Sequence, residues 1–168
     1  AEQWRIDGWD HELALEAMVQ AADSMHLGLD AYAELGYIPS DHEHESVSKT
    51  LEYAFDDACI SRYARSHGRP ELAQRFGRRA SSWKNLVNSG SGFIQAKRQG
   101  DWVEGFDPRE VNFNFTEANG WQYLFAPAHD VAGQKDILGG DEGYLNRLNA
   151  LFTAPIQTTG RIQPDITG

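Results

Sequence analysis

Residues 45–64 read ESVSKTLEYAFDDACISRYA, and this stretch decides the fold class. At about 100° per residue, a helix here gathers apolar side chains on one side. Those side chains are Val47, Leu51, Ala54, Phe55 and Ala58. The opposite side carries a narrow polar stripe made of Glu45, Lys49, Glu52, Asp56 and Tyr63. The stretch is therefore predicted to form a long helix with two different faces.

The polar stripe has two possible interpretations. Glu45 and Lys49 lie four residues apart and could form a favourable ion pair on a solvated face. Glu52 and Asp56 are like charges at the same spacing, which is unfavourable unless a ligand uses them. An inner helix of a helical toroid would instead turn this stripe toward a central cavity. Helical geometry alone leaves both a solvated face and a pocket wall open.

Helical patterns precede and follow this stretch. Asp10 can cap a first helix whose apolar residues recur to about residue 25. A short apolar segment at 27–35 ends at the glycine and proline of residues 36–39. Pro70 suits the first turn of a third helix, in which apolar residues recur at helical spacing up to residue 87. The first half of the chain is therefore predicted to be mainly helical.

The second half combines one long irregular region with shorter helical segments. Residues 91–116 are predicted to form a long loop or a short β-hairpin. Thr116 can cap a short helix over residues 117–127. Two further helical patterns cover residues 129–139 and 141–152. Since hardly any strand is expected, the chain is predicted to be all-α.

Length and composition exclude several classes of protein. The chain has 168 residues, which suits one domain or a piece of one. The formal net charge is −10, so the phosphates of a nucleic acid would be repelled. No run approaches the roughly 18 consecutive apolar residues of a membrane-spanning helix. The single cysteine, Cys59, excludes an internal disulfide and is expected to be a small buried hydrophobic residue.

Residues 112–123, NFNFTEANGWQY, contain the most chemically informative segment. One carboxylate, several amides and four aromatic rings occupy twelve positions. Buried amides and acids each need partners, so this mixture suits a core poorly. It suits sugar binding well, because rings pack against C–H faces while amides and carboxylates bind hydroxyls. Position alone leaves Glu117 open as either an ordinary charge at a helix start or a catalytic acid.

Residues 42–45, His-Glu-His-Glu, are the one cluster that resembles a metal-binding sequence. These residues are adjacent in a polar loop and lack the i,i+4 spacing or separated pairs of a tetrahedral site. Phosphate-binding glycine loops, serine nucleophile elbows and helical zinc motifs are absent from the sequence. No metal site is therefore predicted within the chain, and carboxylate chemistry remains.

Three motifs taken together resemble glycoside hydrolase family 92. They are Gly-Tyr-Ile-Pro at 36–39, the run at 45–57, and Thr-Glu-Ala-Asn-Gly-Trp-Gln-Tyr at 116–123 followed by Pro127, His129 and Asp130. The resemblance extends in the same order from about residue 10 to Phe152, and the run at 45–57 is highly specific. This family consists of calcium-dependent, inverting exo-α-mannosidases.

The resemblance implies roles for particular residues. In the family, the glutamate of a Glu-Gly-Asn-x-Trp-Gln-Tyr motif is the general acid, which implies that role for Glu117. Here Ala118 replaces the usual glycine and Gly120 follows the asparagine, so the backbone beside the acid is expected to differ. The predicted substrate-binding residues are Trp121, Gln122, Asn119, Lys49 and Glu52.

The resemblance also implies a fold and an extent. Family enzymes are several times longer, with an amino-terminal β-sandwich and an (α/α)6 barrel. The chain is expected to be one internal segment of that barrel, residues 1–168, and therefore an all-α partial toroid. In the family, calcium ligands and the general base lie downstream of this segment. The segment alone is therefore expected to lack activity and to depend on the rest of its parent polypeptide.

The expected substrate is a mannose-containing glycan, with α-1,2-linked mannose removed, and the expected location is periplasmic or secreted. A rival interpretation is a non-catalytic helical domain that binds carbohydrate through Trp102, Trp121 and Tyr123. A helical protein-interaction module is a further rival, but it would need stacked repeats that the sequence lacks.

Overall fold

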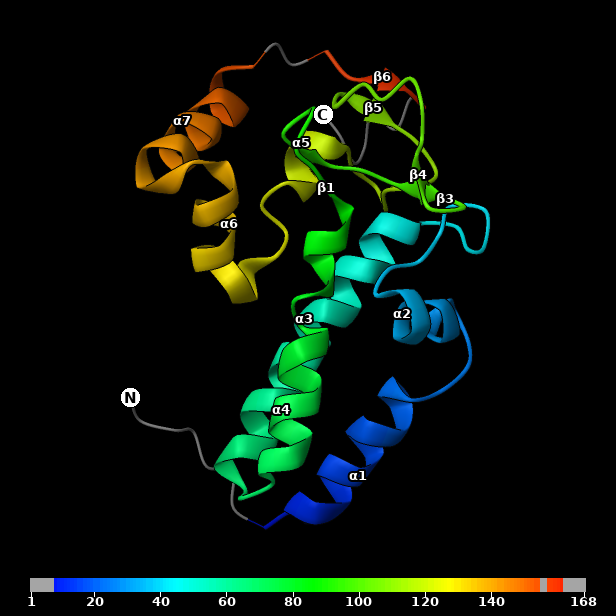
Figure 1. Cartoon of the computed structure of the whole chain (residues 1–168), viewed down its shortest axis with the longest axis vertical. Helices are drawn as coiled ribbons and strands as arrows, with labels where there is room; N and C mark the ends of the chain where they lie inside the picture. The colour runs from blue at the N-terminus through cyan, green and yellow to red at the C-terminus, as the bar shows by residue number, and fades with distance from the viewer. Residues whose placement is uncertain (1–7, 155–156, 162–168) are drawn as a thin grey trace.

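The computed structural model describes residues 8–154 and 157–161, and helices dominate it (Figure 1). The α-helices are α1 (His11–Ala22), α2 (Leu29–Leu35), α3 (Ser46–Ser66), α4 (Pro70–Arg79), α5 (Gly120–Tyr123), α6 (Val131–Leu138) and α7 (Gly140–Thr153). Two short 3₁₀ helices are η1 (Ser82–Leu86) and η2 (Ala128–Asp130). The all-α prediction is confirmed, and the helices form an open, partial toroid.

Helix α3 is the central element, and α4 runs back along it (Figure 1). Its predicted apolar face is largely buried, although Phe55 is exposed. The same helix also buries polar side chains that tie it to its neighbours. The Thr50 hydroxyl accepts a hydrogen bond from the Ile38 amide (3.0 Å), and the Ser61 hydroxyl donates to the Ala73 carbonyl (2.7 Å). These hydrogen bonds satisfy polar groups that would otherwise be buried unpaired.

Apolar side chains gather in two main clusters along α3. The larger cluster surrounds the N-terminal half of α3 and contains Val47, Leu51, Ala54, Trp83, Leu86, Phe93, Ile94, Ala96, Phe115 and Leu124. The smaller cluster joins α1, α3 and α4 and contains Leu15, Ile60, Ala64, Ala73 and Phe76. The larger cluster therefore holds the long loop and α5 against the end of α3 where the candidate site lies.

Two helix starts agree with the sequence, but one helix end does not. Asp10 caps α1 by accepting hydrogen bonds from two first-turn amides, and α4 begins at Pro70 as predicted. The predicted continuation of α4 to residue 87 is wrong, since the helix ends at Arg79. The Arg79 carbonyl accepts a hydrogen bond from the Tyr32 hydroxyl (3.1 Å), and the Ala80 carbonyl binds His129 Nε2 (2.8 Å). These tertiary partners replace the intrahelical ones that a longer helix would need.

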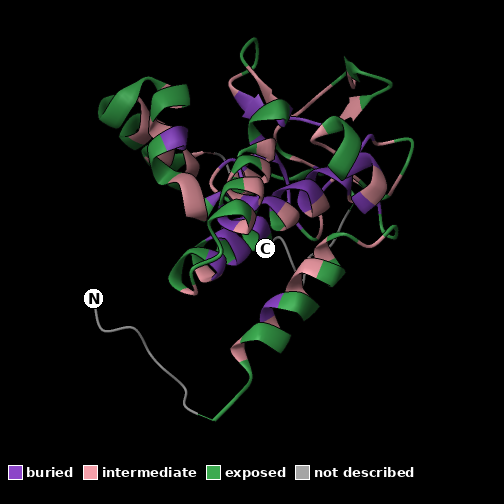
Figure 2. Ribbon diagram, turned by 60° about the horizontal axis from the view of Figure 1, so that its bottom comes forward, coloured by how far each residue is buried: buried purple, intermediate pink, exposed green. Residues whose placement is uncertain are grey.

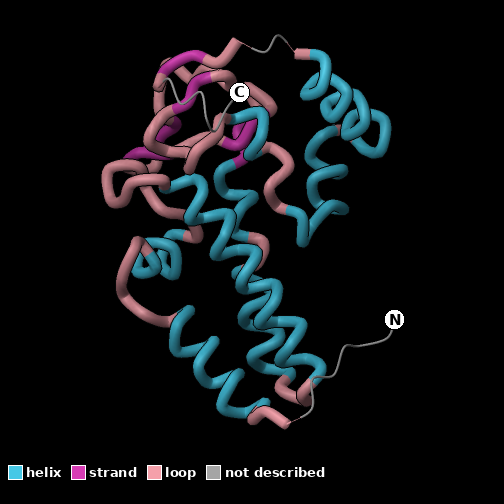
Figure 3. Tube along the Cα trace, turned by 180° about the vertical axis from the view of Figure 1, so that it is seen from behind, coloured by secondary structure: helices cyan, strands magenta, loops and turns pink. Residues whose placement is uncertain are grey.

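Short strand pairs occupy one end of the molecule (Figure 3). Val87–Asn88 (β1) pairs antiparallel with Phe93–Ile94 (β2), and Lys97–Arg98 (β3) pairs antiparallel with Asp101–Trp102 (β4). The predicted short hairpin within residues 91–116 is therefore confirmed. A further pair, Glu110–Val111 (β5) with Thr159–Gly160 (β6), is parallel.

Helix α7 differs from the rest because none of its residues, all described by the structure, is buried (Figure 2). Its Arg147 guanidinium lies over the Phe93 ring, 4.8 Å from the centroid, and Tyr144 packs edge-on against Phe125. Leu145 and Phe152 remain exposed. No helix within the described ranges is both long and apolar enough to cross a bilayer.

Candidate active site

The segment that precedes Glu117 crosses the N-terminal end of α3. The Phe113 carbonyl accepts a hydrogen bond from the Glu45 amide (2.7 Å), and the Asn114 carbonyl accepts one from the Val47 amide (3.1 Å). The first amides of a helix have no partner within the helix. Since no side chain caps α3, these loop carbonyls cap it instead and fix the loop at that end of the helix.

The helix predicted to begin at Glu117 begins later. Helix α5 starts at Gly120, and its N-cap is Asn119, whose side chain accepts hydrogen bonds from the amides of Trp121 and Gln122. The Gln122 side chain returns a hydrogen bond to the Asn119 amide (3.1 Å) and completes a capping box. The predicted Thr116 cap is therefore wrong, because Asn119 and Gln122 provide a better one and leave Glu117 outside the helix.

Glu117 lies in a left-handed backbone conformation, with φ of 53°, and its side chain is exposed. This conformation costs a residue other than glycine about 1–2 kcal/mol. Ala118 does not share it, so alanine in place of the family's glycine adds no such strain. Gly120 is needed for space, since a Cβ there would lie 2.8 Å from Phe106 Cζ and 3.2 Å from Pro108 Cα. The altered motif is thus accommodated by packing.

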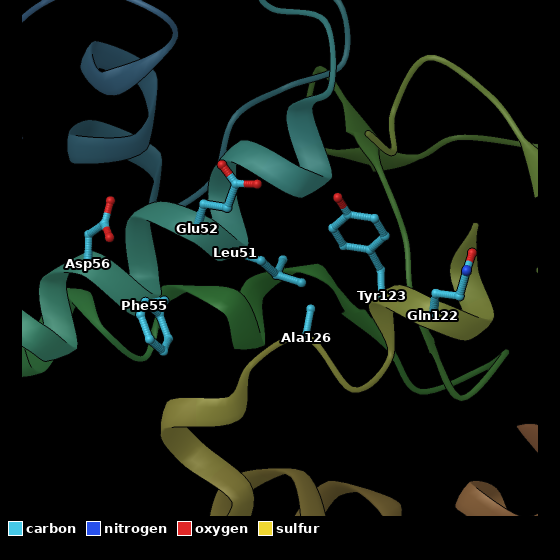
Figure 4. A pocket seen from close by; sticks show the side chains of 7 residues that line it. All are labelled: Leu51, Glu52, Phe55, Asp56, Gln122, Tyr123 and Ala126. Atoms are coloured by element: carbon cyan, nitrogen blue, oxygen red, sulfur yellow. The ribbon is translucent and has the colours of Figure 1, made fainter. Parts of the chain in front are cut away.

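A cavity of about 530 Å³ lies between α3 and α5 (Figure 4). Its volume falls within the range of about 300–1,000 Å³ that is typical of small-ligand sites. The lining residues are Leu51, Glu52, Phe55, Asp56, Gln122, Tyr123 and Ala126. The two carboxylates come from α3, whereas the amide and the phenol come from α5. The cavity therefore joins the predicted polar stripe to the Glu117 motif.

The α3 side of the cavity carries two neighbouring carboxylates whose charged forms are disfavoured. Burial raises the pKa of Glu52, and the neighbouring carboxylates of Asp56 and Glu45 raise it further. Burial also raises the pKa of Asp56. The solvated-face interpretation required an ion pair between Lys49 and Glu45. Lys49 instead forms its ion pair with Glu43 (3.1 Å). The acidic pair is thus left open to a ligand that carries hydrogen-bond donors.

The predicted binding residues occupy different positions around this cavity. Glu52 and Gln122 line it. Lys49 lies on α3 one turn before Tyr53 and is partly exposed in its ion pair. Asn119 is buried as the cap of α5. Trp121 is half-buried and packs edge-on against Phe93 of the larger cluster, with ring centroids 4.9 Å apart.

Ser48 was not predicted from the sequence, and Tyr123 was named only as a binding residue of the rival carbohydrate-binding domain. Ser48 is fully buried, and its hydroxyl accepts a hydrogen bond from the Thr116 amide (2.7 Å). The Tyr123 hydroxyl donates to the Thr116 carbonyl (3.1 Å). Ser48 precedes Glu52 by one helical turn on the same face, and only this spacing hinted at a role. Cys59, expected to be buried, is exposed because its part of the α3 surface is uncovered.

Helix α3 also buries a carboxylate, Asp57, for which the sequence predicted no role. Asp57 accepts hydrogen bonds from the Tyr32 hydroxyl (2.8 Å) and Arg79 Nε (3.0 Å). Burial raises the pKa of Asp57 to about 6, although the Arg79 charge and the Tyr32 hydrogen bond oppose that shift. This group joins α2, α3 and α4.

The described side chains do not supply enough ligands for a metal ion. Within the described ranges, no three His, Cys, Asp or Glu side chains lie close enough together to hold an ion. Calcium needs six to eight oxygen ligands. The described residues therefore do not fit a calcium site by themselves.

The chain matches one protein family over almost its whole length. The sequence model described as the Glycosyl hydrolase family 92 catalytic domain matches residues 1–167. Among curated proteins, a relative from Arthroderma benhamiae is 25% identical over 195 residues and is called an uncharacterized secreted glycosidase. The match covers 92% of this chain but only 25% of the relative.

Three similar solved structures come from Bacteroides thetaiotaomicron. A family GH92 inverting mannosidase is 32% identical with a TM-score of 0.82, covering 92% of this chain and 22% of that enzyme. A family GH92 α-mannosidase is 37% identical with a TM-score of 0.85, covering 89% and 20% respectively. The same α-mannosidase in complex with mannoimidazole is 35% identical with a TM-score of 0.85, covering 91% and 21%. The chain thus spans about a fifth of the length of these enzymes.

Proposed function

The chain belongs to glycosyl hydrolase family 92, and from this premise we propose that it is one segment of the catalytic barrel of an inverting exo-α-mannosidase. The proposed reaction releases α-1,2-linked mannose from glycans. The inverting mannosidase among its structural relatives supports the stereochemistry, and the relative solved with mannoimidazole supports a mannose-like substrate. The remaining barrel and a β-sandwich would come from other parts of the parent polypeptide.

Glu117 is the proposed general acid, and one observation carries this assignment. The amide of the preceding residue, Thr116, is hydrogen-bonded to Ser48, one helical turn from the cavity residue Glu52. Glu117 is exposed and is not among the residues that line the cavity, so the proposal is that its carboxyl, which follows this anchored residue, reaches a glycosidic bond held at the cavity. Protonation of the glycosidic oxygen by Glu117 would let the leaving sugar depart as an alcohol.

Inversion requires a second carboxylate that activates water on the opposite face of the sugar. In inverting enzymes the two carboxyl groups lie about 6.5–9.5 Å apart, which leaves room for that water. The proposed base lies outside this chain, because the family supplies it from a downstream segment. The 168-residue chain alone is therefore proposed to be inactive.

The other predicted residues are proposed to bind the mannose ring. Glu52 and Gln122 line the cavity, so their oxygen and amide groups can pair with sugar hydroxyls. Lys49, Asn119 and Trp121 would shape the same subsite, although Asn119 and Trp121 also support the fold. A calcium ion in the intact enzyme would be held mainly by residues outside this chain, and when bound it would supply a positive charge that stabilises the oxygen atoms of mannose. The proposed location is secreted or periplasmic, and the name of the Arthroderma benhamiae relative supports secretion.

Glu117→Gln in the full-length enzyme tests this function. The amide keeps the size of the side chain but cannot donate the acid's proton. We expect kcat on a mannose disaccharide to fall by about 10²–10⁴-fold, while the affinity for mannose changes little. Glu104→Gln, which removes another exposed glutamate from the same irregular region, is the matched control. Unchanged kcat in Glu117→Gln would contradict the assignment and favour a non-catalytic carbohydrate-binding domain.

A further inference from the structure

The residue before Glu117 is held by hydrogen bonds at both of its backbone polar atoms. The Thr116 amide donates to Ser48 Oγ (2.7 Å), and the Thr116 carbonyl accepts from the Tyr123 hydroxyl (3.1 Å). We infer that Ser48 and Tyr123 are positioning residues that fix the backbone from which the Glu117 carboxyl projects. This inference rests on the proposed function of Glu117, and the two side chains are called the clamp below.

The two halves of the clamp come from the two helices that form the cavity walls, although only Tyr123 itself lines the cavity. Ser48 lies in the first turns of α3 and is completely buried, so its hydroxyl has little freedom to move. Tyr123 is the last residue of α5, and its ring packs against the buried Phe115 with centroids 5.4 Å apart. The clamp therefore fixes Thr116 relative to both α3 and α5. The position of the adjacent Glu117 is then also fixed relative to a sugar bound between these helices.

The backbone on the far side of Glu117 is fixed as well. Ala118 and Asn119 are buried, and Asn119 caps α5. Glu117 is thus an exposed residue between two anchored ones, and its left-handed conformation persists because both neighbours are held. The sign of φ sets the direction of the Cα–Cβ bond. Without the clamp, Glu117 is free to relax to the common right-handed region, which would turn its carboxyl away from the present direction.

The contacts of Thr116 also separate the clamp from ordinary packing. If a hydroxyl only filled space, replacing it by a hydrogen would have little effect on the reaction. Each clamp hydroxyl instead forms a hydrogen bond with a backbone atom of the residue next to the proposed acid. Loss of either hydroxyl should therefore impair proton donation more than it impairs sugar binding. This difference can be measured by changing the basicity of the leaving group.

The experiment compares two substrates in the full-length enzyme. Methyl α-mannoside has a basic leaving oxygen that needs protonation, whereas 2,4-dinitrophenyl α-mannoside has a leaving group that departs without it. We expect Ser48→Ala and Tyr123→Phe each to raise the ratio of kcat on the activated substrate to kcat on the alkyl substrate by about 10–10²-fold. Tyr53→Phe is the matched control, because the Tyr53 hydroxyl also donates to a backbone carbonyl, that of Leu27 (3.0 Å), and its ratio should stay unchanged.

Each outcome has a defined meaning. An unchanged ratio in Tyr123→Phe would overturn the clamp. Tyr123→Phe still tests the clamp if Ser48→Ala does not fold. Glu117→Gln measured on the same substrates distinguishes the two claims. A raised ratio in Glu117→Gln with none in the clamp variants overturns the clamp alone, whereas an unchanged ratio in Glu117→Gln overturns the acid and the clamp together. The HN–Hα coupling of Glu117, measured by NMR, provides a second readout, which should change in both clamp variants.

Discussion

The two faces of α3 carry polar side chains in opposite environments. On the buried face, Asp57 is 1% exposed and is hydrogen-bonded to Tyr32 and Arg79. On the cavity face, Glu52 and Asp56 are exposed, and neither carboxylate has a hydrogen-bond or ion-pair partner within the described part of the chain. Two adjacent aspartates thus differ completely in their surroundings.

This difference separates residues that hold the fold from residues that are open to a ligand. A buried carboxylate is tolerated because its partners compensate for lost hydration. Like charges four residues apart on an exposed helix face are slightly destabilising. The buried face is therefore expected to control stability, and the cavity face is expected to control binding.

The largest effect on stability is expected from Asp57→Ala. Loss of the Asp57 carboxylate would leave Arg79 Nε without its acceptor and would leave the Tyr32 hydroxyl with only the Arg79 carbonyl, whereas the other Arg79 nitrogens would keep Asp23 and the Ala22 carbonyl. We expect the free energy of unfolding to fall by about 3 kcal/mol, measured by urea denaturation. The matched control is Asp56→Ala on the cavity face, for which a change within about 0.5 kcal/mol is expected. Equal losses in the two variants would remove the distinction between the faces.

The pH dependence of unfolding tests the same distinction. Burial raises the pKa of Asp57 to about 6, above the value of about 3.9 in unfolded chains. Between these values the folded state retains a proton that the unfolded state releases, so stability falls as pH rises from about 4 to 6. The expected fall is on the order of 3 kcal/mol, at about 1.4 kcal/mol per pKa unit. Asp57→Asn should remove this component and Asp56→Asn should retain most of it.

Most of the fold followed from local signals in the sequence. Apolar spacing located α3, and Asp10 and Pro70 marked the starts of α1 and α4. The end of α4 could not be predicted in this way, because its last carbonyls are bound by Tyr32 and His129, which are distant in sequence. Tertiary partners of this kind leave no pattern in the helix that they end.

The candidate site was predicted only in part. The polar stripe and the segment at 116–123 were identified from composition and from the family motif, and both border the cavity. The predicted helix start at Thr116 was wrong, because Asn119 and Gln122 form a capping box that starts the helix three residues later. Ser48 was missed because a lone serine on a helix is usually unremarkable. Its importance comes from a loop that lies 68 residues further along the chain.

The smallest effect is expected from Glu52→Gln. Partial loss of hydration at the cavity wall, together with the nearby Asp56 and Glu45 carboxylates, raises the pKa of Glu52, so its charged form is slightly unfavourable. Because Glu52 is exposed, neutralising it should stabilise the chain by only about 0.2–0.5 kcal/mol at low salt, a gain that should shrink as salt is added. Urea denaturation at two salt concentrations measures this change. A clear loss of stability would mean that the cavity face also holds the fold.

The central claim, that Glu117 donates a proton to the leaving sugar, is tested most directly by the pH profile of kcat/KM in the full-length enzyme. Deprotonation of a general acid ends catalysis on the alkaline side of such a profile. The account predicts that the alkaline fall, present in the unmodified enzyme and in Glu104→Gln, is absent from the residual activity of Glu117→Gln. An alkaline fall that persists unchanged in Glu117→Gln would assign the acid to another residue and contradict the account.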